Sequence, residues 1–160
     1  MSEISDAIQQ KCLAFSDRII KLNDYLLEQA AIANAEKQKA LRQRKRTSSI
    51  LHHPSSISAA PVPVYLQSIS ALCNQLLRAS TSIGANNAEA TCAISRADFK
   101  SKSFIALKEA RESLYWLDLL HRNKYLTDVQ YDSLFADCEE LVKVLTHRCK
   151  KLFEPENGGK

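Results

Sequence analysis

The sequence contains few residues that break helices. Only three glycines occur in 160 residues, and two of them, Gly158 and Gly159, lie at the C-terminal end. Three of the four prolines, Pro54, Pro61 and Pro63, fall in one short stretch. A β-sheet protein needs turn residues along its whole length. Their absence from most of this chain therefore favours a few long helices.

Features of several other protein classes are also missing. No apolar run approaches the roughly 20 residues that a membrane span needs, and the first residues lack the basic and apolar regions of a signal peptide. The five cysteines include no CxxC pair, which argues against a zinc knuckle or a redox motif. A cytoplasmic protein with buried, reduced thiols and no membrane association is predicted.

Catalytic and metal-binding motifs are likewise absent from the sequence. It has no Gly-rich phosphate loop, no nucleophile elbow and no Glu-x-x-His pair of the di-iron bundle type. His52 and His53 are adjacent in a Ser/Pro-rich stretch, whereas His121 and His147 are predicted at opposite ends of a bundle. We therefore expect no enzyme activity, no catalytic residue, no metal and no cofactor.

Apolar residues recur at alternating steps of three and four, which indicates helices with one buried face. Four such stripes are present, at residues 4–33, 62–90, 99–121 and 134–152. Their average step of about 3.5 residues is typical of nearly antiparallel bundle helices. The prediction is an all-α protein, a single up-down four-helix bundle over residues 1–160 with a long insertion at 34–62.

Local signals predict two helix starts and one close helix contact. Ser95 is the expected N-cap of the third helix, with Ile94 and Phe99 as a hydrophobic staple. Thr127 and Gln130 form an expected capping box for the fourth helix. Three small residues on buried stripes predict that the second and third helices approach closely: Gly84, Ala106 and Ala110.

The net charge of +4 comes from one segment. Residues 37–46 contain no acidic residue and six basic ones, namely Lys37, Lys39, Arg42, Arg44, Lys45 and Arg46. The remainder of the chain contains the other 16 of the 22 basic residues and all 18 acidic residues, so its net charge is −2. We expect a solvated helical spur that continues the first helix, followed by a Ser/Pro-rich mobile linker at 47–63. The spur is either an electrostatic nucleic-acid site or a solubilising extension.

Charged and aromatic residues share the third predicted helix. The strip consists of Lys108, Arg111, Glu112, Tyr115 and Trp116. Glu109 and Glu112 form a like-charge pair three residues apart, which suits a solvated or subunit-facing strip better than an active site. Because Tyr115 and Trp116 are adjacent, one can enter the core while the other lies at a subunit interface.

Three runs together resemble a known family. They are QLLRASTSIGAN at residues 75–86, SRADF at 95–99 and IALKEARESLYWL at 105–117. This combination is similar to the bacterial four-helix-bundle proteins called 23S rRNA intervening-sequence proteins. The likeness covers residues 62–153 well and 4–29 moderately. Asn87 departs from the family pattern, which has an aliphatic residue there, and a buried polar group needs a partner. Residues 34–62 resemble an insertion.

The resemblance implies a left-handed up-down bundle that assembles into a ring-like homopentamer. It also implies possible contact with nucleic acid, since related bundles are accessory subunits of reverse transcriptases. Two functions stay open at this point. One is a homo-oligomeric scaffold that binds RNA or DNA electrostatically. The other is a protein-binding accessory module of a nucleic-acid enzyme, without direct nucleic-acid contact.

Overall fold

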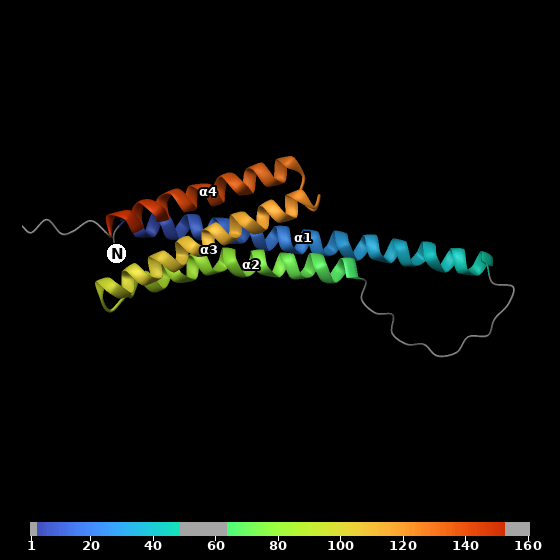
Figure 1. Cartoon of the computed structure of the whole chain (residues 1–160), viewed down its shortest axis with the longest axis horizontal. Helices are drawn as coiled ribbons and strands as arrows, with labels where there is room; N and C mark the ends of the chain where they lie inside the picture. Colours follow the sequence, from blue (N-terminus) through green and yellow to red (C-terminus); the bar gives the residue numbers. More distant parts are fainter. Residues whose placement is uncertain (1–2, 49–63, 153–160) are drawn as a thin grey trace, which may run out of the picture.

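The computed structural model describes residues 3–48 and 64–152, and they form four helices (Figure 1). These are α1 (Glu3–Ser48), α2 (Val64–Thr91), α3 (Arg96–Arg122) and α4 (Asp128–Lys151). The helices alternate in direction along one long axis, so the predicted all-α four-helix bundle is confirmed. Most of the predicted linker lies outside the described residues. Within them, no helix is both long enough and apolar enough to cross a membrane.

Each helix packs against its neighbours in the chain, and α1 also contacts α4. The apolar stripes meet in one core, in which the largest fully buried side chains include Phe15, Ile69, Ile83, Leu117 and Leu141. One residue comes from α1, two from α2 and one each from α3 and α4, so every helix contributes to the core. Burial of such side chains stabilises the bundle by about 1.5–3 kcal/mol each relative to exposure.

The predicted N-caps are present, but one staple is not. The Ser95 hydroxyl accepts a hydrogen bond from the Asp98 backbone N–H (3.1 Å), and Thr127 and Gln130 form the reciprocal capping box. Ile94, however, is 96% exposed, so the expected staple with Phe99 is wrong. The Asp98 carboxylate accepts from the Ile94 backbone N–H instead (3.2 Å). A polar contact thus fixes the α2–α3 turn.

The turn between α3 and α4 closes on a residue in the left-handed region. Lys124 has φ 63°, and its backbone N–H donates to the His121 carbonyl (2.9 Å). The next N–H, of Tyr125, donates to the Leu120 carbonyl (3.0 Å). These two bonds are those of a Schellman motif, which usually has glycine where this chain has lysine. The motif satisfies carbonyls at the end of α3 and reverses the chain into α4.

Gly84 marks a close helix contact, but with a different partner from the one predicted. A Cβ added to Gly84 would lie 3.3 Å from the Cys12 Cβ, so α1 rather than α3 packs over this glycine. Ala110 is fully buried, and its carbonyl accepts a hydrogen bond from the Cys138 thiol of α4 (3.3 Å). The small residues therefore lie at two helix–helix contacts, α1–α2 and α3–α4. The rotation of each helix about its axis decides which neighbouring helix a small residue contacts.

Candidate functional site

The basic segment lies on the part of α1 that extends past the other three helices (Figure 1). Among residues 5–43 of α1, Ala30 is the last buried one, and Lys37, Lys39 and Arg42 are all exposed. Arg44, Lys45 and Arg46 belong to the same helix, but their side chains lie outside the described set. We call residues 37–46 the cationic arm. Three of the six basic side chains of the arm are therefore open to solvent.

The basic positions of the cationic arm do not fall on one stripe of the helix. At about 100° per residue, the sequence distributes these six positions around the helix axis. The ten residues span about 13.5 Å of helix axis. Duplex DNA carries about eight negative charges over that length. The charge density of the arm thus approaches that of nucleic acid, without a face that could select a sequence.

The charged and aromatic strip of α3 is mostly open to solvent. Lys108, Arg111 and Glu112 are exposed, and Tyr115 is 58% exposed. Trp116 packs against the core, while its indole N–H donates to the Glu112 carboxylate (3.0 Å). The two rings meet edge to face with centroids 4.9 Å apart. Trp116 is therefore the ring that lies against the core, and the Tyr115 ring faces solvent.

Glu109 connects this strip to α2. Burial raises the pKa of the Glu109 carboxyl, the nearby Glu112 charge raises it further, and Arg78 of α2 opposes both. Glu112 is thus one of the charges that raise the pKa of Glu109, in keeping with the like-charge spacing in the sequence. Glu109 is half-buried and Glu112 is exposed.

A buried polar network that the sequence did not predict joins three helices. Asn87 of α2 has no exposed surface. Its amide nitrogen donates to the Gln9 side-chain oxygen of α1 (2.5 Å), and its carbonyl oxygen accepts from the Arg148 guanidinium of α4 (2.6 Å). Asn87 thus has partners on both sides. The departure from an aliphatic residue therefore adds a connection between helices.

Comparison with family models gives a match over residues 65–147 to the family described as 23S rRNA-intervening sequence protein. This match covers about half of the chain and includes all three runs that carried the resemblance. A solved structure agrees: the crystal structure of a protein of unknown function from the S23 ribosomal protein family of Bacteroides thetaiotaomicron. It is 35% identical, with a TM-score of 0.63, over 92% of this chain and 98% of that one.

The chain belongs to the 23S rRNA-intervening sequence protein family. A comparison with curated proteins finds no match. The cationic arm lies outside residues 65–147, whereas the α3 strip and Asn87 lie inside them. The family model therefore does not describe the arm.

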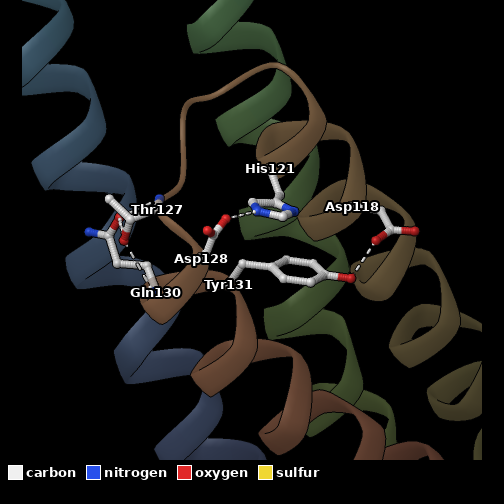
Figure 2. Close-up of polar contacts among 6 residues, drawn as sticks. All are labelled: Asp118, His121, Thr127, Asp128, Gln130 and Tyr131. Atoms are coloured by element: carbon white, nitrogen blue, oxygen red, sulfur yellow. Dashed lines mark hydrogen bonds and ion pairs between the residues drawn. The ribbon is translucent and has the colours of Figure 1, made fainter.

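A second polar cluster of this intervening-sequence protein locks the α3–α4 hairpin (Figure 2). The His121 ring bonds to the Asp128 carboxylate (2.8 Å) and stacks on Tyr131 with centroids 4.2 Å apart. The Tyr131 hydroxyl donates to the Asp118 carboxylate (2.5 Å). Desolvation, then the Asp118 bond, raises the pKa of Tyr131 to about 12, and the His121 bond lowers the pKa of Asp128. The cluster acts as a clamp between two helix ends.

Three buried cysteines have thiols of low reactivity. Burial raises the pKa of the Cys12 and Cys73 thiols to about 11 and that of Cys138 to about 12. Such thiols stay protonated at neutral pH, and a thiol is a poor nucleophile. Within residues 3–48 and 64–152, no three His, Cys, Asp or Glu residues come together as a metal site.

Proposed function

We propose that this protein is a non-enzymatic, homo-oligomeric helical scaffold that binds RNA or DNA through the cationic arm. The observation that carries the proposal is the position of the arm, on a continuous helix that projects beyond a bundle of opposite formal charge. A nucleic acid can approach the arm without facing the acidic residues of the bundle. The proposed location is the cytoplasm, where thiols remain reduced.

Binding by the arm would be electrostatic and largely independent of sequence. Each phosphate neutralised by Lys or Arg releases a counterion, so affinity depends strongly on salt. Sequence-specific reading needs side chains held against base edges, and charges on all sides of one helix do not provide such a face. The arm therefore suits a general grip on the phosphate backbone.

Assembly would multiply the effect of each arm. We propose a homopentamer, with Lys108, Arg111, Glu112, Tyr115 and Trp116 of the α3 strip at the subunit interface. The exposed Tyr115 ring supports this choice, because exposed aromatic residues are enriched at interfaces. Five arms on one particle give a high effective concentration of cations once the first arm has bound.

The experiment is a comparison of two variants with equal loss of charge. The arm variant R42Q/R44Q/K45Q/R46Q should bind a 30-nucleotide RNA at least tenfold more weakly than the parent in fluorescence anisotropy at 50 mM salt. The control variant K21Q/R122Q/K124Q/K150Q removes four exposed cations from the bundle and should bind within threefold of the parent. Equal weakening in both variants would contradict a site on the arm.

The same samples test the assembly. A chain of 18.0 kDa should give about 90 kDa by light scattering if five copies associate. The arm variant should keep this mass and its helical circular dichroism, because the arm lies beyond Ala30 on the part of α1 that projects from the bundle. A mass near 18 kDa at micromolar concentration would contradict the homo-oligomeric scaffold.

A second candidate is a protein-binding accessory module, for example of a reverse transcriptase or another nucleic-acid enzyme. A hollow of about 260 Å³ at the end of the α3 strip favours it, because an inserted side chain could fill this space. The hollow is lined by Tyr115, Asp118, Leu119 and Arg122. This candidate predicts no RNA or DNA binding by the parent at 50 mM salt. Binding of a partner would then be lost on changing Tyr115 to Ala.

A further inference from the structure

A groove of about 610 Å³ lies between the start of α1 and the end of α4. Its apolar lining comes from Ala7 and Ile8 of α1, Val144 of α4 and Leu152, which follows α4. It lies at the bundle end where α1 begins and α4 ends, far along the long axis from the cationic arm (Figure 1). The groove is thus separate from the proposed nucleic-acid site.

Cations line the same groove. They are Lys11, Lys143, Arg148 and Lys151. The Lys11 ammonium pairs with Glu140 and the Lys143 ammonium with Glu139, both at 2.8 Å. Two of the four charges are therefore balanced locally, and the lining retains a net positive charge. An apolar surface with excess positive charge is complementary to a ligand that is apolar and anionic.

Arg148 is the cation best placed for such a ligand. Its guanidinium is partly buried, donates to Asn87 and lies 5.8 Å from the Phe99 ring centroid. Among the described residues, no carboxylate forms an ion pair with it. Burial lowers its pKa, but an arginine remains charged at neutral pH. Since none of the described carboxylates pairs with it, this half-buried guanidinium is a favourable partner for an incoming anion.

The dimensions of the groove indicate a small molecule rather than a helix. Its α4 wall, from Lys143 to Leu152, is about 13.5 Å long. Its α1 wall, from Ala7 to Lys11, is about one helical turn. A helix of 12 residues is already about 18 Å long, which exceeds the length of both walls. The volume lies in the range of about 300–1,000 Å³ that small-molecule sites occupy.

We propose that the α1–α4 groove binds a small organic anion with an apolar body, whose carboxylate, sulfonate or phosphate group pairs with Arg148. The apolar body would lie on Ile8, Val144 and Leu152. Lys151 would add charge at the solvent side. Asn87 would hold the Arg148 guanidinium in place from within the core, so it is a positioning residue for the anion.

The test uses two fluorescent probes that differ by one charged group, 8-anilinonaphthalene-1-sulfonate and the neutral N-phenyl-1-naphthylamine. The parent should bind the sulfonate at least tenfold more tightly, and decanoate should displace it. The variant A7W fills the groove from an exposed position of α1 and leaves Arg148 and Asn87 unchanged. It should bind neither probe, while its melting temperature should stay near that of the parent.

The contribution of Arg148 is measured in the double variant N87L/R148M, which removes the guanidinium together with its buried partner. Preference for the sulfonate should fall to within twofold of the neutral probe. The control K21M removes an exposed cation from α1 and should leave the affinity for both probes unchanged. Equal affinity of the parent for both probes, undiminished binding by A7W, or displacement of the sulfonate by an oligonucleotide would each overturn the proposal.

Discussion

Asn87 of α2 forms side-chain hydrogen bonds with both α1 and α4. Replacing it with Leu would leave the Arg148 guanidinium and the Gln9 carbonyl in a partly buried place without their partner. We expect N87L to lower the free energy of unfolding by about 1–3 kcal/mol, the usual cost of an unsatisfied buried group. Urea denaturation measures the change.

The double variant N87L/R148M distinguishes this explanation from simple loss of packing. Removal of both hydrogen-bonding partners should cost clearly less than the sum of the two single changes, because neither Asn87 nor Arg148 then leaves the other without its partner. Additive losses would show that the Asn87–Arg148 bond contributes no coupling, and that the contact of 2.6 Å is energetically unimportant.

Lys124 is a residue at which the sequence departs from the local optimum. Its left-handed conformation costs a non-glycine residue about 1–2 kcal/mol. Glycine avoids this cost, but its greater freedom in the unfolded chain offsets part of the gain. We expect K124G to raise the free energy of unfolding by about 0.5–1 kcal/mol, measured by thermal or urea unfolding. K124A retains the strain and should give no gain, so a gain in both variants would contradict the argument.

At the scale of elements, the α3–α4 seam depends on a small residue. Ala110 is fully buried where the Cys138 thiol donates to its carbonyl. A110L should overpack this seam and lower the free energy of unfolding by about 1–3 kcal/mol. A88L places the same side chain on an exposed position of α2 and should stay within about 0.5 kcal/mol of the parent. Similar melting curves for A110L and the parent would refute the assignment.

The clamp between α3 and α4 predicts a loss of stability in alkali. The pKa of Tyr131 is raised to about 12 from an ordinary value of 10, so the folded state holds its proton more tightly than the unfolded state. The resulting stabilisation is complete below pH 10 and is lost as the pH rises through 12. Urea midpoints of the parent should therefore fall over this interval.

The variant Y131F removes the titrating hydroxyl and serves as the reference. The difference in stability between the parent and Y131F should be constant between pH 7 and pH 9 and should shrink as the pH approaches 12. A difference that stays constant up to pH 12 would show that the Tyr131–Asp118 bond does not link the protonation of Tyr131 to folding.

The helices and their starts could be predicted because their signals are local. The capping box of Thr127 and Gln130 needs only residues three apart, and it is confirmed. The partners of Asn87 lie 78 and 61 positions away, and they depend on how each helix is rotated about its axis. The same reason explains why Gly84 meets Cys12 of α1 rather than α3. Spacing reveals which residues share a face but not which helix that face meets.

For the whole molecule, α1 connects two regions of opposite formal charge. Its first part belongs to the bundle, and its last part carries six basic residues on a helix that leaves the bundle. A charged helix without a buried stripe gains little from tertiary packing. Its concentration of charge instead suits contact with a polyanion, and the family match over residues 65–147 does not include it.

The salt dependence of RNA binding tests this account most directly. For single strands, the slope of log K against log salt concentration is about −0.7 for each phosphate contact. If all four cations of the arm variant contact phosphates, its slope should be less steep than that of the parent by about 2.8. Anisotropy titrations from 50 to 300 mM salt measure both slopes. An unchanged slope in R42Q/R44Q/K45Q/R46Q, or no binding by the parent at 50 mM salt, would contradict the proposed role of the cationic arm.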